Sequence, residues 1–196
     1  MTDTISLTGN QAAFCDRFPD GRLCRLINRR SGTLLDIQPN LTLVNDNVPQ
    51  VVGKHNSRNA ESAGVQYWMI VPHGDGQAII PVPKDGSSTV RYLSPSSLNT
   101  DRPITISPFP ASFSIFPTSD CPQLSDSPLT SFSVPQGLYE EWTCQISWPH
   151  FRNTEPRMLD LYAGTPTANT KVVLYPYSGT QWQFWRIQFI RYRAGN

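Results

Sequence analysis

The strongest constraint on the fold of this chain is a short pattern that occurs twice. Gln66-Tyr67-Trp68 and Gln183-Phe184-Trp185 share the form Gln-x-Trp, and each follows a Leu-Asp-(Ile/Leu) tripeptide, at residues 35–37 and 159–161. Two linked motifs in the same order indicate two copies of one structural unit. The two tryptophans are 117 residues apart in the sequence, which is about twice the length of one unit, so we expect a third copy between them.

Each copy contains four strand-like runs, which are separated by Gly, Pro, Asn and Ser. We expect strands at residues 23–28, 33–37, 51–52 and 66–72, then at 77–83, 89–95, 104–108 and 111–117, and finally at 141–148, 158–164, 171–179 and 183–190. In the middle copy we align Phe113-Ser114-Ile115 with Gln-x-Trp. We expect residues 1–18 to be irregular and residues 118–137 to form a long surface connection.

The composition supports an all-β class and narrows the range of partners. The 18 prolines and 12 glycines are spread along the chain, which suits short strands and tight turns better than long helices. The net charge is +1 and 16% of residues are charged, so there is no basic stripe for nucleic acid. No run of about 18 apolar residues predicts a membrane span, and no signal peptide is visible, so we expect a cytoplasmic protein.

The sequence shows no pattern typical of a metal site, a cofactor site or an enzyme. The separations of the four cysteines, Cys15, Cys24, Cys121 and Cys144, fit neither a metal clamp nor a dense disulfide framework, so we favour free buried thiols over a disulfide. The three histidines are far apart in the sequence, and no nucleophile motif accompanies them. We therefore expect a protein that is not an enzyme and binds no cofactor.

Three four-stranded units cannot each bury an apolar face alone, but together they close a barrel around one core. With this architecture and its Gln-x-Trp motifs, the chain resembles the ricin-B-type lectin family, whose fold is the β-trefoil. The resemblance implies one domain over residues 1–196, with repeats at about 20–72, 76–117 and 138–190. Trp68 and Trp185 are then structural: each ring enters the core, while the glutamine hydrogen-bonds the backbone of the neighbouring turn.

In such lectins a carboxylate accepts hydrogen bonds from sugar hydroxyls, and an aromatic ring stacks on the apolar face of the sugar. The resemblance assigns these two roles to Asp160 and Tyr175 in the third copy. Asn169 and Tyr177 are candidates for polar and rim contacts. Trp182 stands where the family more often has a polar sugar partner, so it either stacks on a glycan or closes the pocket.

The other two copies fit this site pattern less well. In the first copy Asp36 is in place, but the aromatic position falls on Lys54 or His55. An aspartate in a hairpin also commonly accepts backbone N–H bonds, so Asp36 has a purely structural interpretation as well. Tyr175 and Tyr177 likewise have one, as cover for the barrel rim. The second copy has Ser94 in place of the aspartate, and we expect no sugar site there.

Two functions from different classes follow from the resemblance. The first is a non-catalytic lectin that binds galactose or N-acetylgalactosamine glycans, similar to fungal cytoplasmic lectins with a defence role. The aromatic-rich composition is compatible with a homodimer. The second is a β-trefoil protease inhibitor that acts through long loops such as those at residues 54–65, 94–103 and 118–137. Sugar binding and protease inhibition distinguish the two.

Overall fold

The computed structural model describes residues 4–42, 49–55, 66–84, 87–96, 103–118, 141–148 and 157–194, apart from 166 and 168. The expected connection at 118–137 and Cys121 therefore lie outside the described residues, except for Thr118. Most described residues lie in strands, with one α-helix and two short 3-10 helices. The all-β class predicted from the sequence is confirmed.

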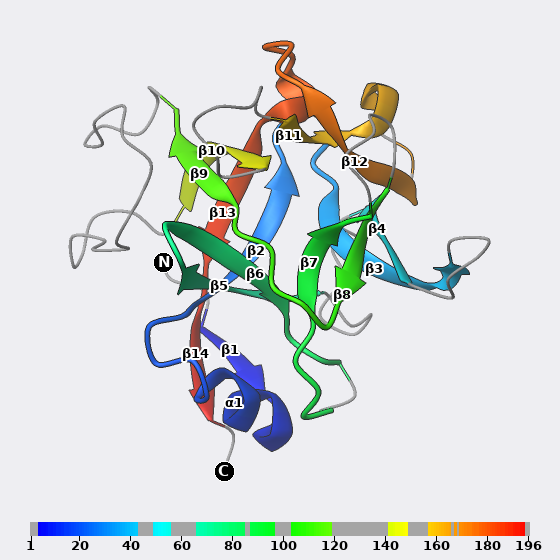
Figure 1. Cartoon of the computed structure of the whole chain (residues 1–196). Helices are drawn as coiled ribbons and strands as arrows, with labels where there is room; N and C mark the ends of the chain where they lie inside the picture. The colour runs from blue at the N-terminus through cyan, green and yellow to red at the C-terminus, as the bar shows by residue number, and fades with distance from the viewer. Residues whose placement is uncertain are drawn as a thin grey trace.

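The main sheet contains 12 strands and forms a closed barrel (Figure 1). Its strands are β2 (Arg22–Asn28), β3 (Leu34–Thr42), β4 (Pro49–Lys54), β5 (Trp68–His73), β6 (Gly76–Pro81), β7 (Tyr92–Pro95), β8 (Ile104–Ser107), β9 (Ser114–Pro117), β10 (Glu141–Trp148), β11 (Arg157–Leu161), β12 (Thr170–Pro176) and β13 (Trp185–Phe189). Each expected strand coincides with one of these, although several boundaries differ by a few residues.

The barrel encloses one apolar core, to which both motif tryptophans contribute. Trp68 and Trp185 are fully buried, together with Leu26, Leu35 and Leu159 from strands around the barrel. Burying a large aromatic side chain is strongly favourable because it removes a large apolar area from water. The prediction that the tryptophans enter the core is confirmed.

From Thr4 on, the N-terminal segment forms regular structure, so the expectation that residues 1–18 are irregular is wrong for the described residues. Residues Thr4–Leu7 form β1, which pairs in parallel with β14 (Arg191–Ala194), and Gly9–Cys15 form α1. Thr8 caps the helix in a capping box with Gln11. Figure 1 shows α1, β1 and β14 together beneath the barrel.

This N-terminal segment covers a second apolar cluster at that end of the barrel. Its own residues Leu7, Ala12, Phe14 and Cys15 pack with barrel residues Leu23, Met69, Ile80, Val82 and Ile190. The pairing strand β14 lies at the far end of the chain, so no local pattern in residues 1–18 predicts the pairing of β1 with β14. The segment is held by packing and by pairing with β14.

The sheet register corrects our alignment of the middle copy. Trp68 pairs with Cys24, and Trp185 pairs with Cys144. In the middle of the chain the corresponding bridge joins Phe113 to Gln77. Phe113 thus occupies the place of the tryptophan, whereas we had aligned Ile115 there. The error arose because the middle copy has neither Gln nor Trp to fix the alignment, and the fully buried Phe113 fills the space instead.

The described cysteines agree with the expectation of free thiols. Cys15, Cys24 and Cys144 are buried and form no disulfide. Burial raises the pKa of Cys15 to about 11, with a smaller contribution from the charge of Asp16. Burial raises the pKa of Cys24 further, and Cys144 adds to this effect. These side chains are apolar packing elements of the two clusters.

Candidate functional site

The Gln-x-Trp motifs fix the positions of the two aspartate hairpins. The indole Nε1 of Trp68 donates to the carbonyl oxygen of Leu35 at 3.0 Å, and that of Trp185 donates to Leu159 at 2.8 Å. In each case the accepting leucine directly precedes the aspartate of the Leu-Asp pair. A buried indole N–H needs a partner, and here its partner is the backbone that carries Asp36 or Asp160.

Gln183 fixes the turn that follows β12. Its Nε2 donates to the carbonyl oxygen of Pro176 at 2.8 Å, and its Oε1 accepts from the backbone N–H of Ser178 at 2.9 Å. Gln66 donates to the carbonyl oxygens of Tyr67 and Val82 at 2.8 and 2.9 Å. Both glutamines are buried, so the predicted contact with neighbouring backbone is confirmed.

The β11–β12 hairpin carries Asp160 and Tyr175 on the same face. Leu159 and Leu161 of β11 point into the core. Because side chains alternate along a strand, Met158 and Asp160 point to the outer face. Met158 pairs with Tyr175, and Asp160 pairs with Val173. Asp160 and Tyr175 are therefore diagonal neighbours, a relation in which Cα atoms lie about 7–8 Å apart.

The exposure of the two side chains differs in a way that suits two roles. Asp160 is 7% exposed, so its side chain is largely buried in the hairpin surface. Tyr175 is 41% exposed, which leaves much of its ring available to solvent. A buried carboxylate beside an exposed ring offers a hydrogen-bond acceptor and an apolar surface next to each other.

A second exposed aromatic side chain, which the sequence analysis missed, directly follows β11. Tyr162 begins the 3-10 helix η1 (Tyr162–Gly164) directly after β11 and is partly exposed. The ammonium Nζ of Lys171 lies 3.7 Å from the centroid of its ring, a cation–π contact. The sequence contained a signal for Tyr162. It follows Asp160 by two positions in "LDLY", and strand alternation predicts that residues two apart lie on the same face.

Trp182 is half-buried at the side of this hairpin. It lies in the 3-10 helix η2 (Gln181–Gln183), and its indole packs so closely on Gly164 of η1 that no Cβ fits between them. The guanidinium of Arg30 lies 5.7 Å from its ring centroid. Asn28 donates to the Trp182 carbonyl oxygen at 2.8 Å. Trp182 is thus held from the first part of the chain, by residues that no local sequence signal connects to it.

The other two candidates of the third copy lie at different ends of β12. Tyr177 directly follows β12 and is 60% exposed, in the turn that Gln183 fixes. Asn169 directly precedes β12 with a positive φ of 66° and donates its backbone N–H to Gly53 at 2.9 Å. Asp160 pairs with Val173, which is four residues from Tyr177 and four residues from Asn169, so the register places Tyr175 nearer to Asp160 than either of them.

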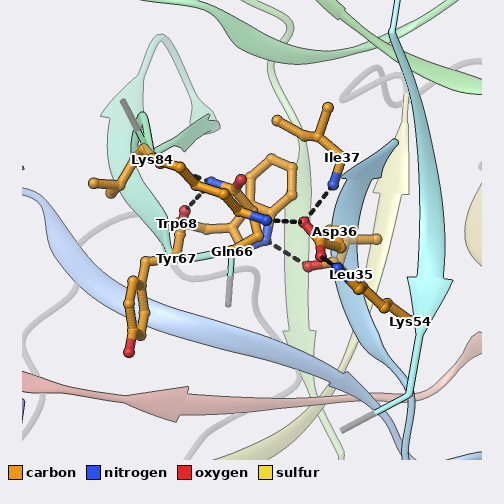
Figure 2. Close-up of polar contacts among 9 residues, drawn as sticks. Leu35, Asp36, Ile37, Lys54, Gln66, Tyr67, Trp68 and Lys84 are labelled. Atoms are coloured by element: carbon orange, nitrogen blue, oxygen red, sulfur yellow. Dashed lines mark hydrogen bonds and ion pairs between the residues drawn. The ribbon is translucent and has the colours of Figure 1, made fainter. Parts of the chain in front are cut away.

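Asp36 lies at the corresponding place of the β3–β4 hairpin, where Lys54 and Lys84 contact its carboxylate (Figure 2). It is 2% exposed and pairs with Val52, as Asp160 pairs with Val173. Its Oδ1 accepts from the backbone N–H of Ile37 at 2.8 Å, which is the structural contact that the sequence left open. Lys84 and Lys54 form ion pairs with its two oxygens at 3.0 and 3.3 Å.

Among the described residues, no group of three His, Cys, Asp or Glu side chains lies close enough to hold a metal ion. Within the same residues, no helix is long and apolar enough to cross a bilayer.

Comparison with known proteins finds the fold but no sequence family. No family model matches the chain, and no curated protein matches it. Among solved structures, the chain is similar to a ricin B-like lectin of Macrolepiota procera in complex with lactose, with a TM-score of 0.56, 17% identity, and coverage of 87% of this chain and 95% of that one. It is also similar to the Rhizoctonia solani agglutinin, with a TM-score of 0.53, 19% identity, and coverage of 87% and 95%.

A third similar structure belongs to a larger protein. An exo-β-1,3-galactanase from Clostridium thermocellum matches with a TM-score of 0.57 and 17% identity over 88% of this chain but 31% of that one. At these identities the likeness establishes the fold rather than the activity. The β-trefoil fold implied by the sequence resemblance is confirmed.

Proposed function

We propose that this chain is a non-catalytic carbohydrate-binding protein whose sugar site is the outer face of the β11–β12 hairpin. The observation that carries the proposal is the diagonal placement of Asp160 and Tyr175 on that face, with one side chain buried and the other exposed. The likeness to a lectin in complex with lactose and to an agglutinin supports the same class of function.

The proposed architecture is one domain of three four-stranded repeats, at about residues 20–72, 76–117 and 138–190. The equivalent pairs Cys24–Trp68, Gln77–Phe113 and Cys144–Trp185 support it, because each joins the first strand of a repeat to its last. The two indole bonds to Leu35 and Leu159 repeat in the same way. Repeated contacts of this kind are expected of units that share one core.

The chemistry of the site suits a pyranose. A carboxylate forms charge-assisted hydrogen bonds to adjacent hydroxyl groups, and a ring such as that of Tyr175 packs on the C–H face of the sugar. Tyr162, two residues after Asp160 in the sequence, adds a second exposed ring, and Tyr177 lies beyond Tyr175 along the chain. In this arrangement the packed indole of Trp182 bounds the site at its side. Asn169 would contribute from the start of β12, at the end opposite Tyr177.

Galactose and N-acetylgalactosamine glycans are the proposed ligands, with a cytoplasmic, fungal-type defence role as the proposed context. The lactose in the Macrolepiota procera structure is a galactoside, which supports the choice of galactosides as the first probes. The low charge density of the chain is the reason why nucleic acid is left out of the proposed partners. A homodimer stays a prediction, to be tested by light scattering.

The function is tested by binding to a panel of galactose- and N-acetylgalactosamine-terminated glycans. Asp160→Asn and Tyr175→Ala should each weaken binding by about tenfold or more, because a tenfold loss needs only about 1.4 kcal/mol. Phe109→Ala is the matched control, since it removes an exposed ring from outside the hairpin. If the wild-type protein binds no glycan at millimolar concentration, the proposal fails.

The alternative function, a protease inhibitor, draws on loops that lie mostly outside the described residues. The same purified protein should be assayed against papain-like, trypsin-like and pepsin-like enzymes. Nanomolar inhibition without glycan binding would favour the inhibitor over the lectin.

A further inference from the structure

The β3–β4, β7–β8 and β11–β12 hairpins have equivalent pairing registers, but their outer faces carry different residues. At the aspartate position they carry Asp36, Ser94 and Asp160, which pair with Val52, Thr105 and Val173. At the position diagonal to it they carry Lys54, Ser107 and Tyr175. The described strands therefore combine a carboxylate and an aromatic ring in the β11–β12 hairpin, whereas the other two hairpins do not.

We propose that Lys54 and Lys84 close the β3–β4 hairpin to sugars, so that each chain binds one galactoside, at the β11–β12 hairpin. This inference rests on the proposed function and adds the number of sites and the residues that set it. Lys54 and Lys84 are then specificity-determining residues, because they occupy the carboxylate and the ring position of the β3–β4 hairpin.

The first argument is that the acceptor atoms of Asp36 are already engaged. Its Oδ1 accepts from Lys84 at 3.0 Å and from the backbone N–H of Ile37 at 2.8 Å, while its Oδ2 faces Lys54 at 3.3 Å. Figure 2 shows both lysine side chains reaching the one carboxylate from different sides. Each oxygen thus has a cationic partner where a sugar hydroxyl would have to bind.

The second argument concerns the strength of these contacts. The Asp36 side chain is 3% exposed, whereas those of Lys84 and Lys54 are 38% and 44% exposed, and removing the cations from a buried carboxylate leaves its charge uncompensated, which is unfavourable. A sugar hydroxyl is a neutral donor, so a hydroxyl that replaced an ammonium group would not compensate the charge of the Asp36 carboxylate. A neutral sugar therefore does not displace the two ammonium groups from Asp36.

The third argument is the place of Lys54 in the register. Leu34 pairs with Lys54 as Met158 pairs with Tyr175, so Lys54 stands where the third hairpin has its exposed ring. This settles the choice between Lys54 and His55 that the sequence left open. A lysine offers no flat apolar surface for the C–H face of a sugar, so the stacking half of the site is absent as well.

Lys84 reaches Asp36 from another part of the chain. It follows β6 and is separated from Asp36 by 48 residues in the sequence. The ion pair therefore ties the segment after β6 to the β3–β4 hairpin. The contacts among Asp36, Lys54 and Lys84 therefore have a structural role that requires no ligand.

The experiment is a titration with lactose, in which calorimetry measures the number of binding events and their affinity. We expect one site per chain for the wild-type protein, loss of the binding signal in Asp160→Asn, and a change of less than twofold in Asp36→Asn. Circular dichroism confirms that each variant is folded. A second wild-type site, or a tenfold loss of affinity in Asp36→Asn, would overturn the inference and leave the proposed function standing.

A gain-of-function variant tests the role of the lysines directly. Lys54→Tyr combined with Lys84→Gln frees the carboxylate and supplies a ring, so we expect a second binding event that disappears when Asp36→Asn is added. A folded double variant that still binds one lactose contradicts the assignment to the lysines. Absence of any lactose or other glycan binding by the wild-type protein would instead refute the proposed function itself.

Discussion

The contact between Trp182 and Gly164 makes a sharp prediction for Gly164→Ala. Gly164 has a φ of +61°, and a Cβ placed on it would overlap three atoms of the Trp182 indole. A left-handed φ costs a non-glycine residue about 1–2 kcal/mol, and overpacking adds about 1–3 kcal/mol. We therefore expect the variant to lose about 2–5 kcal/mol of unfolding free energy. Because the indole must move, galactoside affinity should fall as well.

A matched control separates the clash from the backbone strain. Gly32 has a similar φ of +71°, but a Cβ there meets no atom within 4 Å, so Gly32→Ala should show the strain alone. Urea unfolding should place Gly164→Ala about 1–3 kcal/mol below this control. Adding Trp182→Ala to each glycine variant should remove most of that difference. If Gly164→Ala and Gly32→Ala are equally stable, the indole does not lie on Gly164 and the reasoning is refuted.

Three further predictions concern the framework around the site. Trp185→Phe removes the donor to Leu159 and leaves that buried carbonyl oxygen without its partner, so urea unfolding should show a loss of about 2–4 kcal/mol in unfolding free energy. An unchanged urea midpoint would contradict the stabilising role of this hydrogen bond. Thr8→Ala removes the capping box of α1 and should cost about 0.5–2 kcal/mol, seen as faster amide exchange in α1, while the exchange of β13 stays unchanged. Cys15 has its pKa raised to about 11, so its thiol should react with iodoacetamide at pH 8 at least about 100-fold more slowly than in the urea-unfolded chain; equal rates would show that it is not buried. Because the folded state binds this proton more tightly, the associated stability is complete below the unfolded pKa of about 8.5 and is lost as the pH rises through 11.

Periodic apolar patterns and turn residues were sufficient to predict the barrel strands. Each strand from β2 to β13 falls on an expected run, because alternation and Gly/Pro punctuation are local signals. The Gln-x-Trp contacts were also predictable, since a buried Trp and a buried Gln both need backbone partners. The predicted hairpin brought Asp160 and Tyr175 to one face for the same local reason.

What the sequence missed depends on contacts between distant segments. The strand β1 pairs with β14 at the other end of the chain, and α1 is stabilised by packing on the barrel end. The capping box of α1 was the one local signal there, and it starts at Thr8. The expected middle copy was aligned two residues away from the observed register because it lacks both motif residues, and the Gln77–Phe113 bridge reveals the position.

The contacts of Asp36 also depend on segments that are distant in the sequence. Asp36 and Asp160 have equivalent sequence contexts, yet Lys84 joins Asp36 from 48 residues further along. Likewise, Arg30 and Asn28 hold Trp182 from the first hairpin. Side chains that meet across the barrel are set by the closure of the sheet, so local patterns do not encode their pairing.

A crystal structure of the protein soaked with lactose tests the central claim most directly. The account predicts a galactose ring on the outer face of the β11–β12 hairpin, with its hydroxyl groups on the Asp160 carboxylate and its C–H face against Tyr175. It also predicts that the Asp36 carboxylate keeps its contacts with Lys54 and Lys84. Sugar bound at another surface, or at Asp36 with the lysines displaced, would contradict the account.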